Sequence, residues 1–249
     1  MNVFDTHLHL PSPNPAGVEA FNCMIEAYPG FQGGLLILNT PVGVEAILAQ
    51  HARLDPRILL VPFFDPENPW DGILGRSKWV KIHPTYLDLG PDGLQCLIAA
   101  LDRQRPVGVV VHHFPWGPDL RKPSGLEWIV RIAKTLPWLT VLATHGGGYE
   151  SWALRAHAGP LPNVHFDFSC ALHYYEGSDL LRPLIHYFRH SPERVHFGSD
   201  WPDAPPGSQL KECLRLGSEA GLDAHQVESL LLRNANRLWP MAFPGTGAP

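Results

Sequence analysis

The residues Asn2–His9, NVFDTHLH, read as a short buried strand that ends in two histidines. In a strand, side chains two residues apart point to the same side, so His7 and His9 can face one ligand. Zinc and similar divalent metals accept imidazole nitrogen, which makes the pair a candidate for a metal site. By itself the H-x-H pattern is equally typical of two histidines that hydrogen-bond to backbone groups in a loop. The rest of the chain has to decide between these interpretations.

Strand-like runs alternate with helical patterns along the whole sequence. Several runs are almost continuously apolar, as expected for parallel strands that are buried on both faces. The eight predicted strands are Asn2–His7, Gly34–Asn39, Ile58–Phe64, Trp79–His83, Val107–His112, Leu139–Thr144, Val164–Phe168 and Val195–Gly198. The predicted helices are Val42–Arg53, Leu94–Arg105, Leu126–Leu136, Asp179–His190, Gln209–Ala220 and Asp223–Leu238.

This alternation indicates right-handed βαβ units with parallel strands. Eight units predict an α/β fold, a (β/α)8 TIM barrel, and about 250 residues is the usual length of such a barrel. We found no linker of low complexity, so we expect residues 1–249 to form a single domain. An open doubly wound sheet is the alternative. It is disfavoured because no G-x-G-x-x-G follows the first strand, and Gly146–Gly148 follow the sixth strand without that spacing.

Composition and net charge exclude some classes of binding partner. Hydrophobic residues make up 45% of the chain and charged residues 17%, which is enough apolar material for a large core. A net charge of -5 argues against nucleic acid or an anionic membrane as partner, because both select a basic surface. The four cysteines form no C-x-x-C pair, and the N-terminus does not resemble a signal peptide. We expect a cytoplasmic protein that acts on a small molecule, and a homodimer is the candidate assembly.

Ionisable side chains stand at the C-terminal ends of five predicted strands. In a barrel these ends open at one face, where active sites lie. The residues are His7, His9, Lys81, His83, His112, His113, His145 and Asp200. The expected metal ligands are the His7–His9 pair, Asp200 and one histidine of the 112–113 pair. Neighbours on a strand face opposite ways, and His112 ends the apolar run, so His112 is the expected ligand.

Two of these residues have candidate catalytic roles. Asp200 can bind the ion, accept a proton from its water, or do both, although aspartate before a turn is also a common helix N-cap. His145 precedes three glycines, which let the backbone approach a ligand closely. There it can polarise a substrate carbonyl or move a proton, while a structural histidine under a loop is the alternative.

The candidate substrate contacts are less specific. Lys81 can neutralise an acidic site, contact an anionic substrate, or carry a carbamate that bridges a second metal. The other candidates are His83, His113, Trp116, Arg121 and Trp201. The tryptophans suggest an aromatic-lined pocket but are equally typical of a core.

Several motifs in order resemble the amidohydrolase superfamily. They are D-T-H-L-H, V-V-V-H, T-H-G-G and F-G-S-D-W-P, closed by R-N-A-N-R-L at 233–238. The resemblance extends from His7 to Leu238 and is to the amidohydrolase family 2 branch, which holds aminocarboxymuconate-semialdehyde-type decarboxylases and related hydrolases and lactonases. It implies a distorted TIM barrel and one divalent metal ion, usually Zn²⁺, although some members of the branch work without metal.

Carried over residue by residue, the resemblance implies His7, His9, His112 and Asp200 as metal ligands and His145 as the acid/base histidine. The expected reaction is hydrolysis of a C–N or C–O bond, as in an amide or lactone, by metal-activated water. The alternative is metal-dependent, non-oxidative decarboxylation of an aromatic or unsaturated carboxylic acid, with Lys81 or Arg121 holding the carboxylate. The third hypothesis is a non-catalytic metal-binding protein.

Overall fold

The computed structural model describes residues 1–39, 47, 49–64, 78–87, 92–115 and 125–240. Half of the predicted helix Val42–Arg53, residues 42–46 and 48, lies outside these residues, and its end forms the 3-10 turn His51–Arg53. The candidate substrate residues Trp116 and Arg121 also lie outside the described residues.

Within the described residues, eight parallel strands form two sheets in chain order. The first sheet holds β1 (Val3–Leu8), β2 (Phe31–Ile37) and β3 (Ile58–Val61). The second holds β4 (Trp79–Ile82), β5 (Gly108–Val111), β6 (Thr140–Ala143), β7 (Val164–Asp167) and β8 (Val195–His196).

Backbone contacts join the two sheets at both seams. The parallel bridge Phe63↔Lys81 links the end of β3 to β4, and the bridge Leu8↔Trp201 links β1 to the segment after β8. At the second seam the Thr6 amide donates to the Phe197 carbonyl oxygen at 2.9 Å. The strands therefore close into the predicted (β/α)8 barrel.

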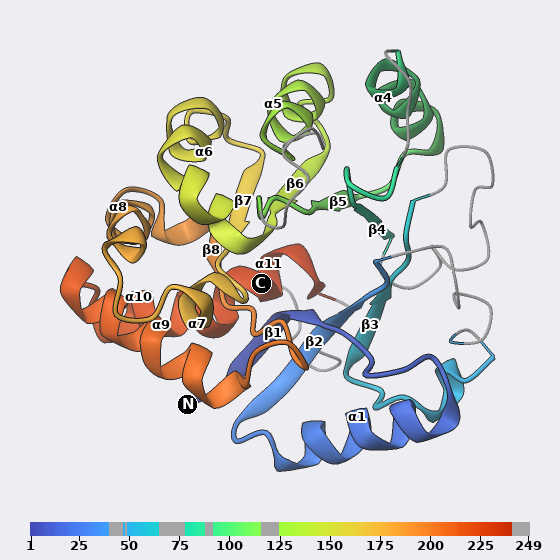
Figure 1. The fold of residues 1–249 in the computed structure, drawn as a ribbon, viewed down its shortest axis with the longest axis vertical. Coiled ribbons are helices and arrows are strands. Elements are labelled where there is room, and N and C mark those ends of the chain that lie inside the picture. The colour runs from blue at the N-terminus through green and yellow to red at the C-terminus, as the bar shows by residue number, and fades with distance from the viewer. Residues whose placement is uncertain (40–46, 48, 65–77, 88–91, 116–124, 241–249) are drawn as a thin grey trace.

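Helices cover the outside of the barrel (Figure 1). They are α1 (Pro15–Ala27), α4 (Gly93–Gln104), α5 (Gly125–Thr135), α6 (Ser151–Ala158), α7 (Ala171–Tyr174), α8 (Arg182–His190) and α9 (Pro206–Ala220). Figure 1 shows α1 beside β1–β3 and α4, α5, α6 and α8 outside the later strands. No helix among the described residues has both the length and the apolar character needed to span a membrane.

Two predicted helices are divided. The predicted Asp179–His190 begins as the 3-10 turn Asp179–Leu181, and α8 starts at Arg182 with Pro183 in its first turn. The predicted Asp223–Leu238 consists of α10 (Ala224–Glu228), a π-helical turn (Ser229–Arg233) and α11 (Asn234–Leu238). Asp223 starts this segment with a capping box in which it pairs with Gln226.

The inside of the barrel is filled by apolar side chains below the candidate site. Phe4 and Trp79, near the start of their strands, contact Trp239, which follows α11. The Trp239 ring stacks on Phe4 at 5.5 Å and lies 4.8 Å from Trp79. The C-terminal segment thus supplies a floor of aromatic rings, and the polar residues at the strand ends lie above it.

Candidate active site

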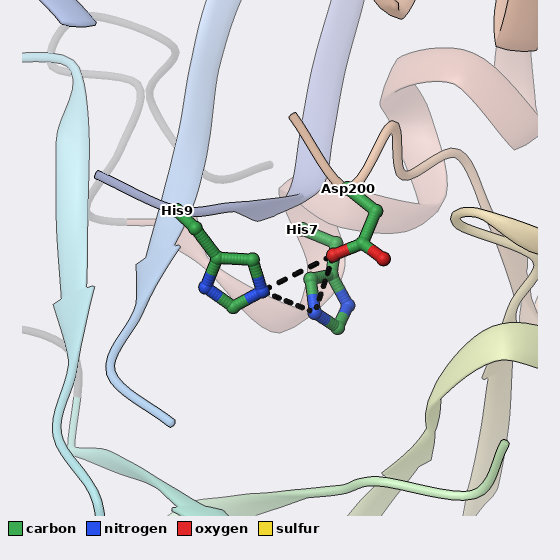
Figure 2. A group of neighbouring side chains, drawn as sticks. All are labelled: His7, His9 and Asp200. Atoms are coloured by element: carbon green, nitrogen blue, oxygen red, sulfur yellow. Dashed lines mark hydrogen bonds and ion pairs between the residues drawn. The ribbon is translucent and has the colours of Figure 1, made fainter. Parts of the chain in front are cut away.

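The structure brings His7, His9 and Asp200 together at the seam between β1 and β8 (Figure 2). The two histidine Nε2 atoms lie 3.1 Å apart. Asp200 Oδ1 lies 3.4 Å from His7 Nε2 and 3.1 Å from His9 Nε2. His7 is fully buried and Asp200 almost so, which makes this a compact set of nitrogen and oxygen donors in a site largely shielded from water.

The backbone of β1 positions this cluster. The Asp200 amide donates to the His7 carbonyl oxygen at 2.8 Å. The buried Asp5 carboxylate accepts hydrogen bonds from the amides of His7 and Ser199, at 3.0 and 2.9 Å. Asp200 itself adopts φ 71°, a left-handed conformation that is uncommon outside glycine but that aspartate tolerates better than most residues. The carboxylate is thereby turned back toward the H-x-H pair.

His145 and His112 border the cluster from β6 and β5. His145 Nδ1 lies 3.0 Å from the Ser169 carbonyl oxygen and 3.8 Å from Asp200 Oδ2. His145 Nε2 lies 3.0 Å from His112 Nδ1. The His112 ring also stacks on His83, with centroids 3.8 Å apart. Two of the predicted site histidines are therefore linked to each other, and His145 links them to Asp200.

The hydrogen-bond partners assign the tautomers of His9, His145 and His112. A carbonyl oxygen can only accept, so His9 Nδ1, 2.8 Å from the Ile37 carbonyl, and His145 Nδ1 both carry hydrogen. Neutral His145 then offers a lone pair at Nε2, which accepts a hydrogen from His112 Nδ1. His112 Nε2 is left as a buried acceptor with no hydrogen-bond partner among the described residues.

This arrangement fits a divalent metal. Metal-binding histidines use one nitrogen for the ion and give the other N–H to a protein acceptor. His9 meets this pattern, with Nε2 beside Asp200. The unpartnered Nε2 of His112 is a further candidate donor, although the ligand atoms that lie within 4.8 Å of one another are those of His7, His9 and Asp200.

His113 turns away from the cluster. Its ring is buried, and Nε2 lies 3.6 Å from a carboxylate oxygen of Glu150. Of the two adjacent histidines, His112 therefore faces the site and His113 packs behind it. The sequence favoured His112 for this position, because it directly follows the apolar run of β5.

The other candidate substrate residues are placed differently. Lys81 is fully buried, and its Nζ has no hydrogen-bond partner among the residues that the structure describes. His83 lies between His112 and Tyr86, with its ring 4.2 Å from that of Tyr86. Trp201 packs against Phe21 of α1, with ring centroids 5.9 Å apart. Of these three, Lys81 and His83 border the histidine cluster.

Asp167 and Ser169 belong to the site but were not singled out from the sequence. Asp167 ends β7 and is fully buried, and its Oδ2 lies 3.4 Å from His7 Nδ1. Ser169 Oγ lies 3.1 Å from His7 Nδ1 and 3.1 Å from His145 Nδ1. The rule that selected the other residues, a polar side chain at the C-terminal end of a strand, also applies to Asp167 and would have found it.

Burial and charge together set the protonation of the cluster. Burial would raise the pKa of Asp200, but His7, His9 and His145 hold that pKa below its usual range. Burial likewise opposes ionisation of Asp167, yet its hydrogen bond with His7 and the nearby histidines keep its pKa at about 2. Burial lowers the pKa of His7 to about 3 and that of Lys81 to about 8.

At neutral pH the carboxylates of Asp167 and Asp200 are therefore ionised, Lys81 is an ammonium group and His7 is neutral. The two negative charges outnumber the one positive charge. A divalent cation would reverse this balance, and the loaded site would then attract an anion.

Comparison with known proteins identifies the family. The sequence model of the Amidohydrolase family, Amidohydro_2, matches residues 79–241, more than half of the chain. The chain belongs to the amidohydrolase family 2 branch of the amidohydrolase superfamily. It is thus an amidohydrolase-like enzyme, as the motifs of the sequence implied. No curated protein sequence matches this amidohydrolase.

Solved structures confirm the barrel. An uncharacterized TIM-barrel protein from Bordetella bronchiseptica has a TM-score of 0.70 at 17% identity, and the match covers 97% of this chain and 99% of that one. A putative 2-pyrone-4,6-dicarboxylic acid hydrolase from Pseudomonas putida has a TM-score of 0.69 at 18% identity, covering 96% and 98% of the two chains. A 5-methylcytosine deaminase from Klebsiella pneumoniae has a TM-score of 0.56 at 16% identity, covering 90% and 63%. At these identities the likeness is one of fold.

Proposed function

We propose that this amidohydrolase is a metal-dependent hydrolase that cleaves a C–N or C–O bond, as in an amide or a lactone, of a small molecule. One observation carries the proposal. His7 Nε2, His9 Nε2 and Asp200 Oδ1 lie within 3.4 Å of one another at the C-terminal face of the barrel, although Asp200 is about 190 residues from the two histidines in the sequence. Such a convergence of imidazoles and a carboxylate is typical of a catalytic metal centre.

We propose one divalent ion, most favourably Zn²⁺, because nitrogen from imidazole and oxygen from carboxylate are ligands that zinc accepts. His7, His9 and Asp200 would hold it, and His112 would contribute its free Nε2. When bound, such an ion acts as a Lewis acid and lowers the pKa of a water from 15.7 to about 7. A site with an open coordination position would also distinguish this enzyme from a structural metal protein.

Asp200 has the geometry to do two tasks. Its Oδ1 faces the two histidines, while Oδ2 faces His145 at 3.8 Å. One oxygen can therefore remain with the ligand set while the other accepts the proton of the attacking water. The same carboxyl group then passes that proton to the leaving amine or alcohol. This assigns Asp200 as general base and later general acid.

His145 and Lys81 are proposed to assist. His145 adjoins Asp200 and is neutral at rest, with its Nδ1 hydrogen directed at Ser169. It would stabilise the developing oxyanion once its Nε2, which accepts from His112 at rest, has taken up a proton. The Lys81 ammonium group is buried, without a hydrogen-bond partner among the described residues, and lies in the field of Asp167 and Asp200. It is the candidate cation for a carboxylate on the substrate.

Decarboxylation of an aromatic or unsaturated acid is a second candidate function. The buried Lys81 favours it, because a lysine that holds the carboxylate would orient the C–C bond to be broken. In this reaction His145 Nε2 would first take up a proton from solvent, because the one hydrogen of the neutral ring is directed at Ser169, and would then protonate the carbon that carbon dioxide leaves. Both candidate reactions use the same metal site and differ in the bond that is cleaved.

Metal content tests the site. We expect about one equivalent of zinc per chain by elemental analysis of the purified enzyme, with loss of both metal and activity in His7→Ala. Substitutions of the adjacent residues His112 and His113 provide a matched pair of variants. His112→Ala should lower zinc content, whereas His113→Ala, on the far side of β5, should retain it. Full activity in a chain stripped of metal by chelation would refute the proposal.

Product analysis separates the two reactions. 2-Pyrone-4,6-dicarboxylate, simple amides, lactones and aromatic acids would be offered to the zinc-loaded enzyme, with alkali uptake and carbon dioxide release measured in parallel. The hydrolase proposal predicts alkali uptake without carbon dioxide. Release of carbon dioxide in proportion to substrate consumed would establish the decarboxylase instead.

A further inference from the structure

We infer that Ser169 is a positioning residue which, together with Asp167, fixes the tautomers of His7 and His145 and so couples the metal-binding histidine to the acid/base histidine. The inference rests on the proposed metal-dependent function. It concerns Asp167, the last residue of β7, and Ser169, two residues further along the chain.

Counting hydrogens assigns the direction of each bond. A serine hydroxyl has one hydrogen to donate and two lone pairs to accept with, whereas an ionised carboxylate only accepts. Ser169 Oγ makes a short hydrogen bond to Asp167 Oδ1, so its one hydrogen is used there. Toward the imidazoles the same oxygen can then only accept. His7 Nδ1 and His145 Nδ1, each 3.1 Å away, must therefore carry hydrogen.

The groups around the Asp167 carboxylate are hydrogen-bond donors, so its oxygens act as acceptors. Asp167 Oδ1 receives the Ser169 amide at 3.0 Å and the His145 amide at 3.2 Å, in addition to the Ser169 hydroxyl. Its other oxygen, Oδ2, faces His7 Nδ1 at 3.4 Å. Three N–H or O–H donors on one oxygen and a fourth near the other favour the ionised carboxylate.

The consequence lies at the opposite nitrogens. With hydrogen on Nδ1, neutral His7 directs the lone pair of Nε2 toward Asp200 Oδ1 and His9 Nε2, where the metal is proposed. His145 likewise keeps its Nε2 lone pair for the hydrogen of His112 Nδ1, which leaves His112 Nε2 free. Ser169 thus prepares ligand atoms on two strands before any ion arrives, through its hydroxyl at His7 and through both its hydroxyl and its carbonyl oxygen at His145. This is the role of outer partners in metal sites.

The packing around Ser169 is specific. The serine is fully buried, and Gly198 lies directly opposite. A Cβ built on Gly198 would lie 3.1 Å from the Cβ atoms of both His7 and Ser169. The absence of a side chain at Gly198 allows the hydroxyl to approach the histidine ring.

Three variants test the inference. Ser169→Ala removes the hydroxyl, and Asp167→Asn keeps one oxygen for the backbone amides but turns an NH₂ group toward His7 Nδ1. Ser191→Ala is the control, because Ser191 is also buried but bonds to Arg194, away from the site. The first readout is the set of imidazole ¹⁵N shifts in the metal-free, histidine-labelled protein, assigned with single His→Gln variants. The second is Zn²⁺ affinity, measured by competition with a chromophoric chelator.

We expect Nδ1–H tautomers at His7 and His145 in the unmodified protein. In Ser169→Ala the His7 signals should move toward the Nε2–H tautomer, and in Asp167→Asn they should move further. Zn²⁺ affinity should fall about 10- to 100-fold in both, with no change in Ser191→Ala. Unchanged His7 tautomers together with unchanged affinity would overturn the inference, as would an equal loss in Ser191→Ala. If Ser169→Ala does not fold, Ser169→Cys keeps the volume without a strong donor and takes its place.

The two proposals can fail separately. If the unmodified protein binds no Zn²⁺, the metal-dependent function fails, while the tautomers of the metal-free chain still decide the role of Ser169. If Zn²⁺ binds and the tautomers do not respond to either variant, the function stands and the positioning role is wrong.

Discussion

Two of the residues that matter most adopt an unfavourable backbone conformation. His145 has φ 63° and Asp200 has φ 71°, and each follows directly or closely on a strand of the barrel. Such left-handed residues cost of order 1–3 kcal/mol and persist where the surroundings impose them, which is common at functional sites. Here the conformation turns both side chains back over the C-terminal face of the barrel, where His145 Nδ1 lies 3.8 Å from Asp200 Oδ2.

The substitution His145→Asn tests the proposed catalytic role of the His145 imidazole. Asparagine tolerates the left-handed region, so the backbone should be preserved while the imidazole is lost. We expect kcat to fall by about 10²- to 10⁴-fold, the usual contribution of an acid/base group, with the zinc content unchanged. His186→Asn, on the exposed face of α8, is the control and should keep full activity. Turnover by His145→Asn equal to that of the unmodified enzyme would show that His145 has no part in the reaction.

The segment that leaves β6 shapes one side of the site. After His145, the residues Gly146, Gly147 and Gly148 have φ values of 57°, 77° and 53°. A side chain at Gly146 would also collide with Phe168, since an added Cβ would lie 2.2 Å from the ring. This turn brings the backbone against the end of β7. Ser151 Oγ donates a hydrogen bond to the Gly146 carbonyl oxygen, and the Tyr187 hydroxyl donates to the Ser151 carbonyl oxygen.

Gly146→Ala should therefore destabilise the enzyme by about 2–4 kcal/mol, combining the left-handed backbone with overpacking against Phe168. Gly177→Ala separates the two causes. Gly177 has φ 75° but an added Cβ would meet nothing within 4 Å, so only the backbone cost of about 1–2 kcal/mol applies. Urea unfolding of the metal-free proteins measures both. Equal losses in the two variants would contradict the steric argument.

The whole barrel depends on a residue near the end of the chain. Trp239 is 2% exposed and packs inside the barrel against aromatic rings of β1 and β4. It closes the end opposite the candidate site, so its loss should affect folding more than chemistry. A contact of this kind joins strands that are distant in sequence and stabilises the closed barrel as a unit.

Trp239→Ala should cost about 3–5 kcal/mol in the free energy of unfolding, as expected for loss of a buried aromatic side chain. Trp152→Ala is matched in chemistry, but Trp152 is 53% exposed, and its change should stay within about 0.5 kcal/mol. Denaturant unfolding checks the pair. Equal stability of Trp239→Ala and the unmodified protein would mean that the aromatic floor contributes little.

Acid should destabilise the metal-free molecule through its buried histidines. Burial lowers the pKa of His83 to about 2 and the pKa values of His113 and His165 to about 4. As pH falls below about 6.5, these histidines become protonated in the unfolded chain but stay neutral in the folded protein. The free energy of unfolding therefore falls by about 1.4 kcal/mol per pH unit for each such histidine.

One buried carboxyl opposes this trend. Burial raises the pKa of Asp5 to about 7, so the folded protein holds that proton at a pH where the unfolded chain releases it. Because the histidines outnumber it, the net expectation is a Tm that drops steadily from about pH 6.5 to about pH 4. Calorimetry of the metal-free protein across this range measures it, and a Tm that stayed constant or rose on acidification would contradict the assignment of neutral buried histidines.

The order of strands and helices, and the strand ends that carry histidine and aspartate, could be predicted from the sequence. These features are local, because periodicity and burial of a strand leave a pattern in consecutive residues. The barrel then requires that all strand ends meet at one face, which is why His7 and Asp200 could be expected together despite their distance along the chain. Two predicted substrate residues, Trp116 and Arg121, lie outside the described residues, and their role stays a prediction.

Tertiary structure alone decided which side chains of that face touch. It turned His113 toward Glu150, packed Trp201 against Phe21, and placed Trp239 inside the barrel. It also drew Asp167 and Ser169 under His7 and His145. The physical reason is the same in each case. A side chain's direction and partner depend on the twist of the closed barrel and on contacts between residues far apart in sequence, and neither leaves a mark in the local pattern of residues.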